Sequence, residues 1–193
     1  MAEEVKLKKK ITLRRKQEEA TFTFEGRLRV DLYWKVGTDL DLCLFFRKKD
    51  GEVGGVFSNE YRQKKSDLGS LDKFPYIQHN GDVKRPGESE AHEQINIAKL
   101  DDIDEAFVCI VNYDAAIDGE DVTYAEEGGR IEVKSDSGDY LEVLADSADE
   151  GHVYCVCSIK NRGGEFALKN ESKVMSLSKA YKEIPGFALI CED

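Results

Sequence analysis

The feature that most restricts the fold of this chain is an alternation of apolar and polar residues with a period of two. It is clearest over residues 28–34, where every second residue from Leu28 to Trp34 is apolar and most of the others are polar. The pattern begins at Ala20 and is interrupted at Gly26. A period of two is typical of a strand with one buried face, whereas a helix needs a period of 3.6. The pattern therefore predicts extended structure over residues 20–34, broken at Gly26.

Turn signals divide the rest of the chain into short extended segments. Asp50-Gly51 lies between apolar runs and predicts a hairpin, because both residues tolerate positive φ. Residues 135–138 and 161–164 predict two further hairpin turns. Residues 106–113 are nearly continuously apolar, as in a strand buried on both faces. Residues 152–159 alternate again, which predicts one shared face for the odd-numbered residues from 153 to 159.

Helical spacing is confined to one stretch near the C-terminus. Apolar residues at positions 174, 177, 180, 181 and 184 fit one amphipathic helix, which Pro185-Gly186 would end. Residues 187–191 are apolar enough to form a closing strand. Many short strands separated by Gly and Asp turns are typical of a sandwich. The sequence thus predicts an all-β fold, an antiparallel two-sheet β-sandwich with one short helix near the C-terminus.

The charges are unevenly distributed along the chain. Residues 1–18 carry seven bases and three acids, whereas the whole chain has 39 acids and 28 bases. We therefore expect a flexible basic arm at residues 1–19 and one acidic domain at residues 20–193. The arm could be a solvated tail, or its residues 6–16 could make weak contact with an inner membrane surface. We do not expect the acidic domain to bind nucleic acid, because such binding needs clustered Lys and Arg.

The N-terminal residues lack the apolar segment of a signal peptide, so we expect a cytoplasmic protein. We therefore expect the five cysteines to be reduced thiols, and Cys155 and Cys157 to be core residues. No pair of cysteines or histidines has the spacing of a zinc site. The sequence also has no GxSxG, Walker A, GxGxxG or HExxH motif, so we expect no enzymatic activity.

Two segments are candidates for binding a cation. Asp39 and Asp41 are two residues apart at the start of an expected strand, so they point to the same side, away from Leu40 and Leu42. Two such carboxylates repel one another unless they are solvated or share a cation, and Ca²⁺ takes six to eight oxygens. An ordinary solvated strand edge explains them equally well. Residues 78–93 form a loop rich in oxygen ligands, although its spacing is not that of an EF-hand.

Several of these motifs resemble the tellurium-resistance TerD superfamily, and most closely its TerA branch. The resemblance rests on the segment 28–34 with its Trp, on Gly37-Thr38-Asp39-Leu40-Asp41-Leu42, and on residues 69–77, followed by the Gly81-Asp82 loop and the strand at 108–113. It covers residues 24–113 well and becomes looser from Arg130. The family implies a two-sheet sandwich with calcium sites in the loops at one end, a role in stress response and tellurite resistance, and no established catalytic reaction.

The resemblance also implies a set of calcium ligands. Asp39, Asp41, Asp82 and Glu93 fall at the family's ligand positions, and Glu88 and Glu90 could supply further oxygens in a shifted register. This loop departs from the family pattern, because Val83, Ala91 and His92 stand where acids or Asn are usual, and Lys84 and Arg85 add positive charge. These departures predict one weakened calcium site, or none.

Three functional hypotheses follow from the sequence. The first is a non-enzymatic, calcium-dependent binding module of bacterial stress response and tellurite resistance, with Ca²⁺ ordering the loops at one end of the sandwich. The second is a structural partner among the proteins of a larger stress-response complex, with a degenerate metal site, which uses its acidic face and basic arm. The third and least favoured is an enzyme that holds a metal with Asp39, Asp41 and His79 or His92.

Overall fold

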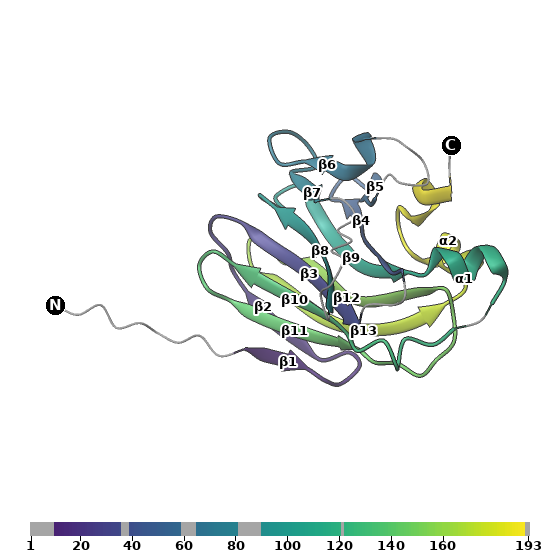
Figure 1. Cartoon of the computed structure of the whole chain (residues 1–193). Coiled ribbons are helices and arrows are strands. Elements are labelled where there is room, and N and C mark those ends of the chain that lie inside the picture. The colour runs from purple at the N-terminus through teal and green to yellow at the C-terminus, as the bar shows by residue number, and fades with distance from the viewer. Residues whose placement is uncertain (1–9, 36–38, 59–64, 81–89, 121, 192–193) are drawn as a thin grey trace.

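The computed structural model describes residues 10–35, 39–58, 65–80, 90–120 and 122–191. Two β-sheets pack face to face with the main hydrophobic core between them (Figure 1). Within the described residues, all strand pairs are antiparallel except the one between the first strand and its neighbour. The predicted all-β sandwich is therefore confirmed.

Sheet A contains the long alternating strand that dominates the sequence pattern. Its strand order is β1-β11-β10-β3-β8-β7-β6. The bounds are β1 Ile11–Leu13, β3 Leu28–Lys35, β6 Gly69–Ser70, β7 Ile77–His79, β8 Glu90–Ile97, β10 Gly129–Ser135 and β11 Tyr140–Ala145. The apolar residues of β3 that alternate from Leu28 to Trp34 are at most 3% exposed and face sheet B.

Sheet B contains the apolar strand that was expected to be buried on both faces. Its order is β2-β13-β12-β9-β4-β5. The bounds are β2 Glu19–Phe22, β4 Asp41–Lys48, β5 Val53–Val56, β9 Ile103–Val111, β12 Val153–Asn161 and β13 Phe166–Met175. β9 lies between β4 and β12, and its residues belong alternately to the inter-sheet core and to a second apolar cluster outside the sheet.

The three predicted hairpins are confirmed, and so is the interruption at Gly26. β4 and β5 join through Asp50-Gly51, where Gly51 has φ of 93°, and the pairs β10–β11 and β12–β13 join through the other two turns. Gly26, with φ of 77°, separates β2 in sheet B from β3 in sheet A. The break in the alternation is thus the place where the chain changes sheet.

The prediction of one shared face along residues 153–159 is wrong beyond Cys155. A β-bulge lies between Cys155 and Cys157, and it shifts the register against both neighbouring strands. Val153 and Cys155 therefore belong to the outer cluster, whereas Cys157 and Ile159 belong to the core between the sheets. An extra residue in one strand reverses the side that the following residues face.

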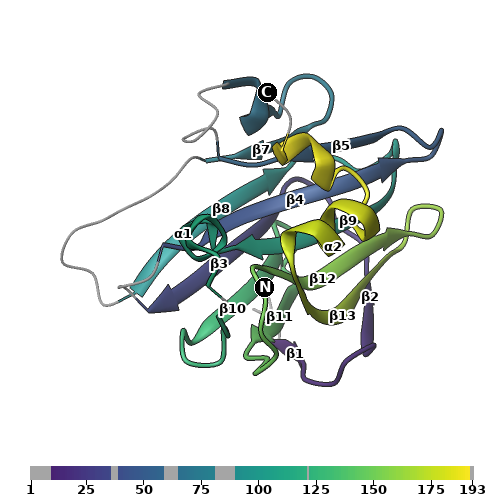
Figure 2. The same cartoon turned by 90° about the vertical axis from the view of Figure 1, so that its right-hand side faces the viewer.

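The C-terminal part differs from the sequence prediction in two respects. The helix α2 spans Leu177–Glu183 only, because β13 continues through Val174 to Met175 and Ser176 caps the helix through its hydroxyl. Residues Phe187–Cys191 form a 3-10 helix, η2, and not a closing strand. Apolar character alone cannot distinguish a strand from a short buried helix. Figure 2 shows α2 in front of β9 and β12.

Two further short helices were not expected from the sequence. They are α1 at Tyr113–Asp118 and the 3-10 helix η1 at Lys65–Leu68. In α1, the Asn112 side chain accepts a hydrogen bond from the Ala115 N–H, and Gly119 ends the helix in a left-handed conformation. Its six residues are too few to produce a helical periodicity that can be recognised in the sequence.

The expected arm, residues 1–19, includes residues that belong to the two sheets. β1 pairs in parallel with β11, and Leu13 is 1% exposed in the inter-sheet core. β2 begins at Glu19. Residues 11–13 and 19 are thus parts of sheets and not of a flexible arm, and residues 1–9 lie outside the described part of the chain.

Candidate functional site

The predicted ligand Glu93 lies inside the sandwich and contacts the opposite sheet. It is on the inward face of β8, next to the core residues Ile95 and Ile97, and it is fully buried. Its Oε2 accepts a hydrogen bond from the Leu42 N–H of β4 at 2.7 Å and lies 3.5 Å from Nε2 of the buried His79. His79 Nε2 is also 2.9 Å from the Leu42 carbonyl oxygen. Because a carbonyl only accepts, Nε2 is the donor in that bond.

The pairing of β4 explains why two polar side chains are buried here. β9 pairs with the whole of β4, whereas β5 pairs only with Leu44 to Arg47. The N–H and C=O of Leu42 therefore lie beyond the end of β5 and would be buried without a strand partner. Glu93 and His79 bind these two groups in place of a strand, which satisfies the strong tendency of buried backbone groups to be hydrogen-bonded. The pair thus connects the two sheets at this end of β4.

Asp41 is adjacent to Leu42 in the chain, but its side chain lies on the other side of β4. Asp41 is the first residue of β4 and is 8% exposed, and Asp39 precedes the strand and is half-buried. Side chains alternate along a strand, so Asp41 shares its side with Cys43, which belongs to the cluster outside sheet B. Leu42 and the Glu93 carboxylate lie on the inter-sheet side.

Glu90 binds an arginine of the same sheet. It forms a bidentate ion pair with Arg130, with Nη1–Oε2 and Nη2–Oε1 distances of 2.7 and 3.1 Å. The hydrogen bond from Arg130 is the main reason that the pKa of Glu90 is lowered. Both carboxylate oxygens therefore have a protein partner. The other two predicted ligands, Asp82 and Glu88, lie outside the described residues.

These contacts test whether the predicted ligands fit a calcium ion. Ca²⁺ needs six to eight oxygens at 2.3–2.6 Å, as in known calcium sites. Of the four ligands in the described ranges, Glu90 is bound to Arg130, and Glu93 and Asp41 approach β4 from opposite sides. No group of three or more His, Cys, Asp or Glu side chains within these ranges could hold a metal ion. The described residues by themselves do not fit a calcium cage.

A second polar cluster lies on the outer face of sheet A. Thr12, Glu142, Glu132, Asp31 and Gln94 are register partners on five adjacent strands, so they form one row across the sheet. The three carboxylates of this row are 2–6% exposed. Each has a partner that can compensate its charge, because Lys10 pairs with Glu142, Lys134 with Glu132 and His92 with Asp31.

Asp31 of this row is bound by two side chains of β8. Its Oδ1 is 2.6 Å from His92 Nε2 and accepts a hydrogen bond from Gln94 Nε2 at 2.7 Å, and the His92 ring stacks on Tyr33 with 4.5 Å between centroids. Burial raises the pKa of Asp31, but the hydrogen bonds from His92 and Gln94 outweigh it, so its pKa is lowered overall. His92 thus belongs to the outer face and does not point toward Glu93.

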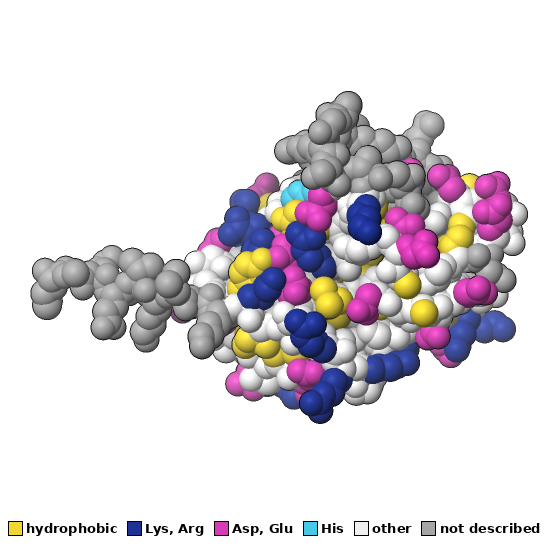
Figure 3. Space-filling view, turned by 60° about the horizontal axis from the view of Figure 1, so that its bottom comes forward, with side chains coloured by type: hydrophobic (Ala, Val, Ile, Leu, Met, Phe, Trp, Pro, Cys, Tyr) yellow, Lys and Arg dark blue, Asp and Glu magenta, His cyan; other side chains and the backbone are white. Residues whose placement is uncertain are grey.

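The described residues on one face of the molecule do not form a large basic area. On the face shown in Figure 3, Lys and Arg side chains alternate with acidic ones. On sheet A, Arg130 lies over the Tyr33 ring at 4.4 Å and Lys134 over the Tyr140 ring at 5.0 Å. Such a face offers many specific polar contacts, but it lacks the continuous positive charge that would attract a polyanion.

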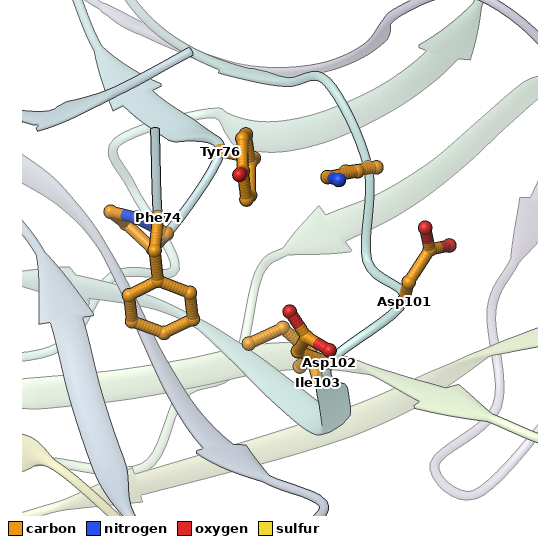
Figure 4. A pocket seen from close by; sticks show the side chains of 7 residues that line it. Phe74, Tyr76, Asp101, Asp102 and Ile103 are labelled. Carbon is orange, nitrogen blue, oxygen red and sulfur yellow. The ribbon is translucent and has the colours of Figure 1, made fainter. Parts of the chain in front are cut away.

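The described surface has depressions of about 290 Å³ beside Lys179 and about 310 Å³ beside Lys49, and a smaller one. The smaller one is lined by residues 74–76, Lys99 and residues 101–103 (Figure 4), and it has no space for a water-sized sphere. The Lys99 Nζ lies 4.1 Å from the Tyr76 ring centroid, so the Lys99 side chain covers one wall of this depression. The residues that line this depression include no nucleophile beside a base. The smaller depression therefore offers no recognisable chemistry to a small substrate.

No family model, curated protein or solved structure matches this chain. The resemblance to the TerD superfamily therefore stays a prediction that rests on its motifs. No helix in the described ranges is long and apolar enough to cross a membrane.

Sequence reasoning missed the roles of His79, His92 and Asp31. The two histidines were considered only as members of the loop or as metal ligands, and Asp31 was counted only as a polar residue between apolar neighbours. Their partners are far apart in sequence, since His79 binds Leu42 and His92 binds Asp31. Residues 78–93 were expected to form one loop, whereas His79 ends β7 and residues 90–93 begin β8, so the sequence prediction did not show which side these side chains face.

Proposed function

We propose that the protein is a non-enzymatic binding module that acts as a partner in a larger bacterial stress-response assembly, and that the rim of its sandwich is held by its own side chains without a resident cation. The observation that carries this proposal is the contact of Glu93 and His79 with Leu42. A carboxylate expected to bind Ca²⁺ is used instead to complete the hydrogen bonding of β4. The bacterial stress-response context comes from the resemblance to the TerD superfamily.

The outer face of sheet A is the surface that we assign to the partner. The helices α1, α2 and η2 lie on the side of sheet B (Figures 1 and 2), and α2 and η2 contribute to the cluster that covers part of its outer face. The sheet A face is polar, and Lys10 and Arg29 are each 44% exposed at their side chains. Exposed charges backed by a rigid sheet suit a specific contact with another protein.

Lysine cross-linking in the producing cell tests this assignment. We expect cross-links to a partner at Lys10 and Lys134 on the sheet A face, and few at Lys179 and Lys182 on α2, which serve as the matched control. Peptide mapping by mass spectrometry measures both sets. Equal or higher yields on α2 would contradict the assignment of the face.

A second candidate function is calcium-dependent binding at the same end of the molecule. It is favoured by Asp41, a carboxylate only 8% exposed, with Asp39 two residues before it. In that case Asp39, Asp41 and Asp82 would be the principal ligands.

Calorimetric titration of chelator-treated protein with Ca²⁺ distinguishes the two candidates. Under the first we expect no binding heat and an unchanged melting temperature in chelator, since nothing is removed from the folded state. Binding in the micromolar range of calcium sensors, abolished by the double change Asp39→Asn and Asp41→Asn, would establish the second. Asp50→Asn, in the hairpin turn between β4 and β5, is the control.

A further inference from the structure

Three cysteines form a row across sheet B. Cys43 of β4 is the register partner of Cys109 in β9, and Cys109 is the register partner of Cys155 in β12. Residues paired directly across neighbouring strands point to the same side of the sheet. All three belong to the apolar cluster outside sheet B, whereas Cys157 lies in the inter-sheet core. The row is therefore a feature of the fold that the spacing of the cysteines in the sequence does not reveal.

The backbone geometry of this row suits a disulfide. Directly paired residues of antiparallel strands have Cα atoms about 4.5–5.5 Å apart. That interval lies within the range of about 4.4–6.8 Å found for disulfides. Cys109 can bond to only one neighbour, so a single oxidation would link β9 either to β4 or to β12.

The contacts of the thiols favour Cys155 as the partner. The Cys109 thiol is hydrogen-bonded to Cys155. The Cys43 Sγ lies 3.9 Å from the Asp41 carbonyl oxygen of its own strand, to which it donates. Cys155, a direct register partner of Cys109, is thus favoured over Cys43 as its partner.

The C-terminal segment covers this pair. Ala180 and Ile184 of the α2 region and Phe187 and Ile190 of η2 belong to the same apolar cluster as the three thiols. Cys43, Cys109 and Cys155 are at most 3% exposed. Burial, together with the hydrogen bond to Cys155, raises the pKa of the Cys109 thiol well above its ordinary value. In the closed structure the thiols are therefore protected, because the thiolate is the reactive form.

We propose that Cys109 and Cys155 are a site of oxidative modification, at which a peroxide joins the two thiols into a cross-strand disulfide when the segment α2–η2 opens. The sulfur of one thiol attacks a peroxide oxygen, the O–O bond breaks, and a sulfenic acid and water form with hydrogen peroxide as the oxidant. The second thiol then attacks the sulfenic sulfur, the S–S bond forms, and a second water leaves. Two thiols are oxidised by two electrons in all, and one peroxide is reduced to two waters.

The test treats the folded full-length chain with hydrogen peroxide, blocks the remaining thiols by alkylation, and maps the linked peptides by mass spectrometry. We expect the loss of two of the five thiols and a dominant Cys109–Cys155 link. Cys155→Ala should remove this link, and Cys157→Ala, the matched control, should retain it.

The identity of the linked cysteines also shows whether the disulfide formed in the folded or in the unfolded chain. In an unfolded chain, cysteines close in sequence are linked more easily than Cys109 and Cys155, which favours links among Cys155, Cys157 and Cys191. A dominant Cys155–Cys157 link, or a dominant link to Cys191, would overturn the proposal.

The role of the cover is tested by Phe187→Ala. Phe187 is fully buried, and its ring packs on Phe45 with 5.1 Å between centroids. Its truncation should raise the rate of formation of the same link by roughly tenfold or more, because local opening becomes easier. An unchanged rate, or five intact thiols in both proteins, would overturn the proposal.

Discussion

Two carboxylate–imidazole pairs lie on opposite faces of sheet A, and their surroundings differ. Asp31 and His92 meet on the outer face of sheet A, and Glu93 and His79 meet on its inner face. His92 and Glu93 are consecutive residues of β8, paired with Tyr33 and Leu32 of β3. One step along the strand therefore separates a pair at the protein surface from a pair inside the core.

The two carboxylates differ in the groups that form hydrogen bonds with them. Asp31 is held by the side chains of His92 and Gln94, and the His92 side chain is 32% exposed. Glu93 is held by the backbone of the opposite sheet, and both side chains of its pair have no exposed surface. The outer pair is part of the polar outer face of sheet A, whereas the inner pair completes the hydrogen bonding between the sheets. Their replacements should differ accordingly.

Replacing Glu93 by Ala should have the largest effect. It leaves the buried N–H of Leu42 without its acceptor and breaks a buried pair, so we expect the free energy of unfolding to fall by about 3–5 kcal/mol. Urea denaturation followed by circular dichroism measures this change.

Glu90→Ala is the matched control on the same strand. Glu90 is 43% exposed at its side chain and pairs with Arg130, so its loss should cost less than about 1 kcal/mol. Equal effects of the two substitutions would mean that the inner pair does not hold the sheets together.

Replacing Asp31 by Asn should have a smaller effect that depends on pH. Asn keeps the shape of Asp31 but not its charge, so we expect a loss of about 1–2 kcal/mol at neutral pH. The pKa of Asp31 is lowered in the folded protein. Its contribution is therefore complete above the ordinary pKa of an aspartate and is lost as the pH falls through the lowered value.

Unfolding of the wild-type and Asp31→Asn proteins across a series of acidic pH values measures this dependence. The difference between the two proteins should shrink toward zero as the pH falls. A difference that stays constant down to the lowest pH would show that Asp31 acts through its shape and not through its charge.

The sandwich itself could be predicted from local patterns. The alternation in β3, the apolar run of β9 and the turn at Asp50-Gly51 each depend on a few neighbouring residues, and each gave the correct element. The bulge between Cys155 and Cys157 could not be predicted, because a two-fold pattern does not record an extra residue. η2 was predicted as a strand because a short apolar run is compatible with both structures.

The candidate site was less predictable than the fold. Glu93 was predicted as a calcium ligand, but its contact with Leu42 depends on the point at which β5 stops pairing with β4. The opposite orientations of Asp41 and Glu93 likewise depend on which sheet each strand joins. A family motif places residues along the chain, but it does not say which backbone group a buried carboxylate will bind.

The sequence by itself determined which segments are extended, where the chain turns, and which residues of each strand are apolar. These properties follow from steric preferences and solvent exclusion among residues that are close in the chain. Only the tertiary structure decided that Cys43, Cys109 and Cys155 form one row, and that Glu93 and His79 complete the edge of β4. Strand order and register bring together residues that are distant in sequence, and local periodicity contains no information about that choice.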